Sequence, residues 1–279
     1  QIVRDVQPQA CIFGDGGPEV RWVGNEKGIA SEPCWATLNR DDFIPGEADA
    51  SRLGTGNRNG TAWVPAECDV SIRPGWFYHP SEDDQVRSPD DLFDLYFRSV
   101  GRGASLLLNL PPDRRGQIHE NDARALAGFQ RLLARTFDVD LARSARAAQG
   151  RSWLDNPRYG PDKAIDGDLD TYWHPGTAHE SDLVLTFAQP IQFNVVSLRE
   201  YLPLGQRIEG FMLESWHRDD WRQFAQGTSI GSRRLLYISR EIRTNRLRLR
   251  ITHAPAGPAL AEIGLFAAPA IETSDRADT

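Results

Sequence analysis

The chain has 279 residues, of which 40% are hydrophobic and 25% are charged, and its formal net charge is −7 at pH 7. This composition is typical of a globular protein with room for two domains, and the acidic balance argues against a nucleic-acid partner. No run approaches the roughly 18 consecutive apolar residues of a membrane-spanning helix, so we expect no membrane partner either.

The cysteines give no support for a disulfide framework or a zinc site. Cys11, Cys34 and Cys68 are odd in number and follow no zinc-ligand spacing. Cys11 lies in the apolar run ACIF, and we expect it to be a small buried hydrophobic residue. The residues before this run are typical of a helix end and a turn rather than of a signal peptide, so the chain looks as if it opens partway through a larger unit.

Strand-like and helix-like segments alternate over the first 140 residues. The run ACIF, residues 10–13, predicts a buried strand. The segment SPDDLFDLYFRSVGRG, residues 88–103, predicts a helix that Ser88 caps and Pro89 begins.

Two further segments continue this alternation. ASLLLNLPPD, residues 104–113, predicts a short strand that is buried on both faces and stops at the double proline. Residues 119–137 carry apolar side chains at helical spacing and predict an amphipathic helix. Strands that alternate with helices indicate a parallel sheet with helices outside it.

The pattern changes near residue 140. From about residue 183, apolar runs separated by turns are typical of an antiparallel β-sandwich: DLVLTF, FNVVSLREYL, IEGFMLESW, WRQFAQG, RRLLYISREI, NRLRLRIT and AEIGLFAA. We therefore divide the chain into an α/β domain at 1–140, a β-sandwich at 141–270 and a polar tail at 271–279. No internal repeat is convincing.

Charged and aromatic side chains gather where the strands of the first domain are expected to end. Glu26 follows the first apolar run and its glycine-rich loop, and seven such residues crowd the segment 63–79: Trp63, Glu67, Asp69, Arg73, Trp76, Tyr78 and His79. In parallel-stranded barrels the loops at these strand ends build the active site. Aromatic rings beside carboxylates and arginine suit a sugar, because rings stack on its apolar face while charged groups bind its hydroxyls.

Three of these segments resemble the glycoside hydrolase family 29 α-L-fucosidases. They are GDGGPEVRWVGNEKG (14–28), WVPAECDVSIRPGWFYH (63–79) and SVGRGASLLLNLPPDRRGQI (99–118). The first two are most similar to the subfamily that cleaves branched α-1,3/1,4-fucosyl linkages. The resemblance implies part of a (β/α) TIM-type barrel and a retaining hydrolase with an aspartate nucleophile, a glutamate acid/base and no catalytic cofactor.

The resemblance also assigns roles to individual residues. Glu26, in the motif GNE, matches the general acid/base. Arg21 matches an arginine that contacts fucose, and Trp76 matches the aromatic residue that packs on the C5 methyl side of fucose. Glu67 is expected to hold hydroxyls or order its loop, and His79 is expected to support the substrate site.

The nucleophile of the family is not found in this chain. It lies well upstream of the acid/base in a W-F/L-D-G-like motif, whereas only 25 residues precede Glu26 and none carries that motif. Asp15, Glu67 and Asp69 are the nearest candidates for a replacement. Three alternatives follow: a fucosidase or its C-terminal part, an inactive carbohydrate-binding remnant, and a partial barrel that becomes active by self-association.

The sandwich resembles the discoidin-like fold, also called coagulation factor 5/8 type C or carbohydrate-binding family 32. The resembling segments are DKAIDGDLDTYWHP (162–175) and LAEIGLF (260–266). Many such domains bind a structural calcium ion where these two segments meet. The matching candidates are Asp166, Asp168, Thr171 and Glu262, with backbone carbonyls completing an oxygen shell.

The resemblance implies partners as well as residues. The substrate would be a fucosylated oligosaccharide or glycoconjugate. Because a partial barrel exposes sheet edges and an apolar face, we expect a homo-oligomer or another association that covers them. The family suggests a bacterial periplasmic or secreted protein.

Overall fold

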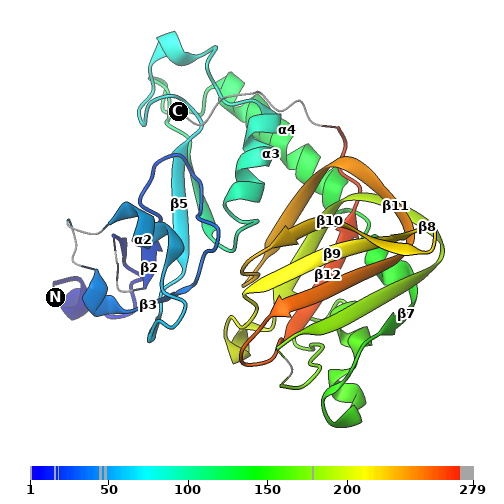
Figure 1. Cartoon of the computed structure of the whole chain (residues 1–279). Coiled ribbons are helices and arrows are strands. Elements are labelled where there is room, and N and C mark those ends of the chain that lie inside the picture. The colour runs from blue at the N-terminus through cyan, green and yellow to red at the C-terminus, as the bar shows by residue number, and fades with distance from the viewer. Residues whose placement is uncertain are drawn as a thin grey trace.

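The computed structural model describes residues 2–15, 17, 19–43, 46, 49–177 and 179–270. A parallel α/β part is built from the first half of these residues and an antiparallel sandwich from the second half (Figure 1). Within the described residues, no helix has both the length and the apolar character needed to cross a membrane.

The α/β part is organised around a four-stranded parallel sheet. Its strands, in spatial order, are β1 (Phe13–Gly14), β2 (Val20–Trp22), β5 (Ala66–Ser71) and β6 (Ser105–Asn109). A small pair of antiparallel strands and two short helices flank this sheet: β3 (Thr37–Leu38), β4 (Ala62–Trp63), α1 (Ile2–Val6) and α2 (Ala50–Thr55). The predicted parallel sheet with helices outside it is confirmed.

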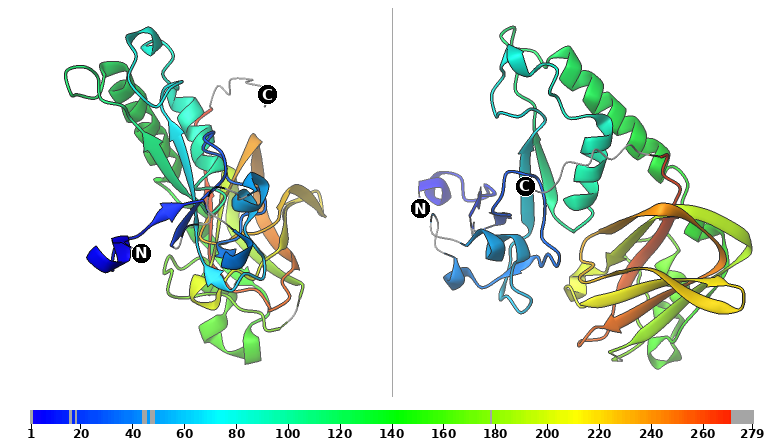
Figure 2. Two further views of the ribbon diagram at one scale, coloured as in Figure 1. Left: turned by 90° about the vertical axis from the view of Figure 1, so that its left-hand side faces the viewer. Right: turned by 45° about the horizontal axis from the view of Figure 1, so that its top comes forward.

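Two long helices cover one face of this sheet. They are α3 (Pro89–Arg98) and α4 (Glu120–Phe137), and both were predicted. The Ser88 side chain and Asp91 form a reciprocal capping box at the start of α3. Apolar side chains of both helices share a core with Val70 and Ile72 at the end of β5. Figures 1 and 2 show α3 between β5 and the sandwich.

The opposite face of the sheet is partly open, which corrects two predictions. The strand around Phe13 is not buried: Phe13 is 41% exposed, and Cys11 is exposed rather than a core residue. β6 is not buried on both faces, because Leu107 is 50% exposed. The physical reason is that β1 and β6 are the two edge strands of this sheet, and within the described residues each pairs with a single neighbour.

The second half folds into an antiparallel β-sandwich, as predicted. Its strands run in the order β10-β9-β11-β8-β12, with β7 paired to β8: β7 (Ala145–Gln149), β8 (Ser181–Glu200), β9 (Gly210–His217), β10 (Asp220–Gly227), β11 (Arg234–His253) and β12 (Leu260–Phe266). The runs predicted as four separate strands at 182–202 and 233–252 are instead two long strands, β8 and β11. Irregular pairing between Tyr237 and Ile242 lets β11 continue without ending.

The two parts pack against each other through a shared core. Leu235 and Phe266 of the sandwich lie in the same buried cluster as the apolar faces of α3 and α4. The Leu235 N–H donates to the carbonyl of Gly101 at 2.8 Å. Gln206 accepts from the Ala36 N–H at 2.6 Å and donates to the Cys34 carbonyl at 3.2 Å. Gln206 of the sandwich half therefore holds the loop that follows β2 in place.

Candidate functional site

Glu26 lies on a tight turn at the C-terminal end of β2. The Asn25 side chain fixes this turn, since its Oδ1 accepts from the Lys27 N–H at 3.1 Å and its amide donates to the Ile29 carbonyl at 2.9 Å. Gly28 has a φ of 74°, and a Cβ there would lie 2.8 Å from Val70. The turn thus presses against the end of β5, while the Glu26 side chain stays exposed.

The carboxylate of Glu26 is held by an aromatic residue from the next strand end. Trp76 follows β5, and its indole Nε1–H donates to Glu26 Oε2 at 2.8 Å. The structure therefore brings together Glu26 and Trp76, which are 50 positions apart in sequence. Both strand ends lie at the C-terminal edge of the parallel sheet, where active sites of such folds form.

Two more carboxylates stand on the open face of β5. Glu67 and Asp69 alternate with the buried Cys68, so they share the face that looks away from the helices. Asp69 accepts from the indole of Trp22 at 2.5 Å. Burial raises the pKa of Asp69 against that hydrogen bond, and the charge of Glu26 adds to the rise. Burial and the charge of Asp69 raise the pKa of Glu67.

Arg21 does not reach this face, which corrects its predicted contact with fucose. Because side chains alternate along β2, Arg21 points to the side opposite Trp22. It is fully buried, and its guanidinium donates to the carbonyls of Leu53, Val64 and Trp35. Its place in the fold is therefore structural.

A buried ion pair anchors the segment that carries Trp76. Arg73 makes a two-pronged contact with Asp122 on α4, with both nitrogen–oxygen distances at 2.9 Å. It also donates to Asp83 Oδ1 at 2.9 Å, and His119 Nε2 lies 3.5 Å from Asp83 Oδ2. An aspartate in the first turn of a helix usually stabilises that helix through its dipole. The sequence therefore did not indicate that Asp122 belongs to this network.

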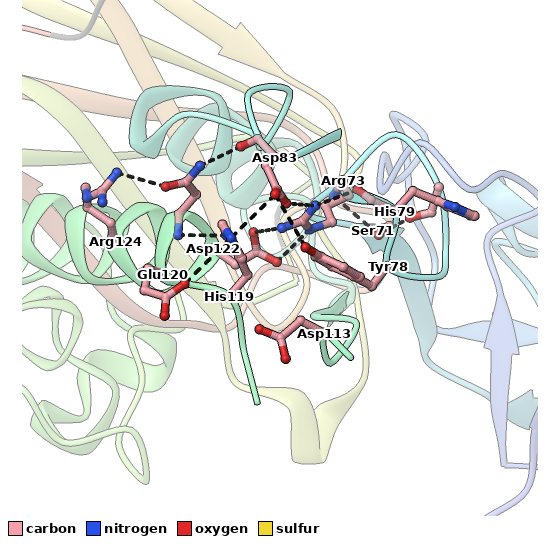
Figure 3. Close-up of polar contacts among 12 residues, drawn as sticks. Ser71, Arg73, Tyr78, His79, Asp83, Asp113, His119, Glu120, Asp122 and Arg124 are labelled. Atoms are coloured by element: carbon pink, nitrogen blue, oxygen red, sulfur yellow. Dashed lines mark hydrogen bonds and ion pairs between the residues drawn. The ribbon is translucent and has the colours of Figure 1, made fainter. Parts of the chain in front are cut away.

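His79 is not part of that network through its side chain. Its imidazole is exposed and points away from Asp83 and Arg73 in Figure 3. Only its backbone carbonyl takes part, accepting from Arg73 at 3.4 Å. The structure therefore places the predicted supporting side chain outside this ion-pair network. Asp15, which follows β1, accepts a hydrogen bond from the Gly46 N–H at 2.5 Å.

Comparisons with known proteins give this arrangement a family. Alpha-L-fucosidase 1 of Arabidopsis thaliana is 38% identical over 269 residues, covering 95% of this chain and 53% of that protein. The crystal structure of SpGH29 matches with a TM-score of 0.90 at 35% identity, covering 96% of this chain and 58% of that one. A GH29 fucosidase of Ruminococcus gnavus, solved in complex with fucose, matches with a TM-score of 0.81 at 26% identity, covering 92% and 52%.

The chain is a relative of the family 29 α-L-fucosidases. It spans about half the length of the plant relative, at 53%. These matches, together with a family match in the sandwich, confirm the predicted architecture of a partial barrel followed by a discoidin-like sandwich. Residues 146–263 match the F5/8 type C domain.

In the sandwich, the side chains of Asp166 and Thr171 lie together with the carbonyl of Asp168, and Glu262 contacts the Gly167 backbone beside them. Thr171 Oγ1 lies 2.8 Å from Asp166 Oδ2 and 3.1 Å from the carbonyl of Asp168. Glu262 Oε2 accepts from the Gly167 N–H at 3.2 Å, while Glu262 Oε1 is buried without a hydrogen-bond partner. Burial and then Asp140 raise the pKa of Glu262 to about 7.

This oxygen cluster has few charged ligands. Among the described residues, no three histidine, cysteine, aspartate or glutamate side chains form a metal-binding group. Lys163 Nζ also lies 3.4 Å from Asp166 Oδ2 and already neutralises part of its charge. A cation here would therefore depend on the Thr171 hydroxyl and on carbonyls as well as on carboxylates. The unpartnered Oε1 of Glu262 is the feature that fits such an ion.

Proposed function

We propose that this chain carries the acid/base side of an α-L-fucosidase active site, acting on α-1,3/1,4-linked fucose of fucosylated glycans. The observation that supports the proposal best is the hydrogen bond from Trp76 to Glu26 at the C-terminal edge of the sheet. An indole that orients an exposed carboxylate also offers an aromatic face for a sugar.

Each residue then has a defined role in a retaining mechanism. The indole engages Oε2 of Glu26, so we assign proton transfer to Oε1. That atom protonates the departing glycosidic oxygen and later removes a proton from the attacking water. Trp76 packs on the fucose ring, and Glu67 accepts hydrogen bonds from fucose hydroxyls. The nucleophile is a carboxylate that a second copy of this chain or another polypeptide supplies, about 5–5.5 Å from Glu26.

The test is hydrolysis of an aryl α-L-fucoside by the chain and by its Glu26→Ala variant. We expect the variant to lose activity by about 10²- to 10⁴-fold, as is usual when a general acid is removed. The loss should be smallest for the most acidic leaving group, and azide should restore turnover. The neighbouring Lys27→Ala variant, in the same turn, is the control and should keep its activity.

The outcomes separate the alternatives. Activity that survives in Glu26→Ala would rule out the acid/base role. Fucose binding without turnover in either form would favour the inactive carbohydrate-binding remnant.

The open face of the sheet is where a second copy or another polypeptide associates. Phe13, Leu107 and Phe77 expose apolar surface at 41%, 50% and 79%, and two of them lie on the edge strands. Sedimentation velocity over a range of concentrations should show a dimer or larger species. A monomer at all concentrations would contradict self-association.

The sandwich binds a structural calcium ion through Asp166, Thr171, Glu262 and the carbonyl of Asp168. Because ligand binding to the folded state alone stabilises it by RT ln(1 + [L]/Kd), excess calcium should add about 2–3 kcal/mol at 100 times Kd. Calorimetry should show a Tm several degrees higher in calcium than in EGTA. Glu262→Gln should remove that difference, whereas Asp219→Asn in the turn between β9 and β10 should not. Equal Tm values for the unmodified chain in calcium and EGTA would exclude the site.

A further inference from the structure

Trp76 is held at its backbone by two polar side chains from the ends of neighbouring strands. Asn109 is the last residue of β6, and Ser71 is the last residue of β5, and the two are partners in the parallel register. Asn109 Nδ2 donates to the Trp76 carbonyl at 2.9 Å and to Ser71 Oγ at 3.1 Å. Ser71 Oγ–H in turn donates to the Gly75 carbonyl at 2.7 Å.

These contacts use the full donor capacity of both side chains. A primary amide has two N–H groups, and a hydroxyl has one. Both hydrogens of the Asn109 amide and the hydrogen of the Ser71 hydroxyl are therefore directed at the Gly75–Trp76 segment or at each other. The arrangement fixes two successive carbonyls, which sets the direction in which the Trp76 side chain leaves the backbone.

The two neighbours of Trp76 pack little against the rest of the chain. Gly75 has no side chain, and Phe77 is 79% exposed. The strong anchors of the loop lie on either side, where Arg73 binds Asp122 and Asp83. Between these anchors, the hydrogen bonds from Asn109 and Ser71 hold the backbone from which the half-buried indole extends.

We infer that Asn109 is a positioning residue for Glu26, acting through the backbone of Trp76, with Ser71 as the intermediate support. The inference rests on the proposed role of Glu26. Asn109 does not contact the reacting atoms in this scheme. Its amide sets the place of the indole N–H, and the indole N–H selects which oxygen of Glu26 faces the leaving group.

The test follows the indole N–H groups of the 279-residue chain by ¹⁵N–¹H NMR as a function of pH. Eight tryptophans give eight indole resonances, and the Trp76 resonance is the one lost in Trp76→Phe. We expect this resonance to move with pH and to stop moving in Glu26→Gln. That variant separates Glu26 from Glu67 and Asp69, whose charges lie nearby. In Asn109→Ala we expect the movement to be lost, and in Ser71→Ala to be reduced.

The matched control is Asn121→Ala. Asn121 also donates its amide to a backbone carbonyl of the same loop, that of Asp83 at 2.7 Å, but away from Trp76. Its removal should leave the movement of the Trp76 resonance unchanged. If Asn109→Ala does not fold, the Ser71→Ala variant alone decides the outcome.

The inference is overturned if the Trp76 resonance keeps its full pH-dependent movement in Asn109→Ala or Ser71→Ala, or if it never responds to Glu26→Gln. None of these measurements requires turnover. A chain that fails to hydrolyse fucosides could therefore still show that Asn109 places the indole against Glu26, and the two proposals can fail separately.

Discussion

Replacing Asp122 with alanine should destabilise the chain by about 3–5 kcal/mol. Asp122 and Arg73 are both buried, with no exposed side-chain surface on either partner. Removing the carboxylate leaves a guanidinium in the interior with one remaining anionic contact, to Asp83 at 2.9 Å. Breaking a buried ion pair on one side costs about this much, because the remaining charge is poorly solvated. Urea unfolding followed by circular dichroism measures the change.

The control for this prediction is a surface pair on the neighbouring helix. Arg98 and Asp94 lie 3.6 Å apart on α3 and are both partly exposed. Asp94→Ala should cost no more than about 0.5 kcal/mol. The double variant Arg73→Met/Asp122→Leu should lose less stability than the sum of the single changes, because it leaves neither charge of the fully buried pair behind. A loss below about 1 kcal/mol in Asp122→Ala would show that water or Asp83 replaces the pair.

Local signals in the sequence were sufficient for the helices and the fold class. Ser88, Pro89 and Asp91 define the start of α3 through hydrogen bonds among adjacent residues, so the prediction depended on no distant contact. Local signals were not sufficient to predict which strands are buried. Whether Leu107 is covered depends on what lies beside β6, and an apolar run carries no information about its neighbours.

The candidate site shows the same difference between local signals and contacts with distant residues. Glu26 and Trp76 were predicted as site residues because each lies in a long motif, and the structure joins them by a hydrogen bond. Asp122 was missed because its partner is 49 positions away. The contact of Asn109 with Trp76 likewise depends on the pairing of β5 with β6, which sequence spacing alone does not give.

The direction of the Arg21 side chain could not be predicted from the sequence either. It adjoins Trp22 in a strand, and neighbouring strand residues face opposite sides. Which of the two looks toward the site depends on the register with β5, where Trp22 pairs with Glu67. A charged residue close to the GNE motif favours a binding role, yet the register places Arg21 in the interior.

Replacing Arg21 with methionine should destabilise the chain by about 3 kcal/mol or more. The guanidinium joins three separate segments, since its acceptors are the carbonyls of Leu53 in α2, Val64 beside β4 and Trp35. Methionine fills similar space but donates no hydrogen bond, and each buried acceptor left without a donor costs about 1–3 kcal/mol. The relief from burying one charge fewer offsets part of that loss. The chemical denaturation midpoint reports the net change.

The result for Arg21 separates a structural role from a role in binding. If Arg21 binds fucose directly, Arg21→Met weakens sugar binding while the free energy of unfolding stays nearly constant. The geometry leads to the reverse expectation: the free energy of unfolding falls, because the contacts of Arg21 are internal.

Arg52→Met is the matched control. That side chain is 49% exposed on α2 and pairs with Asp42 at 3.1 Å, so its loss should stay within about 0.5 kcal/mol. Equal stability of the two variants would mean that the buried carbonyls find other donors. Gly56, whose added Cβ would lie 2.5 Å from the Trp35 carbonyl, shows how little space there is for such a rearrangement.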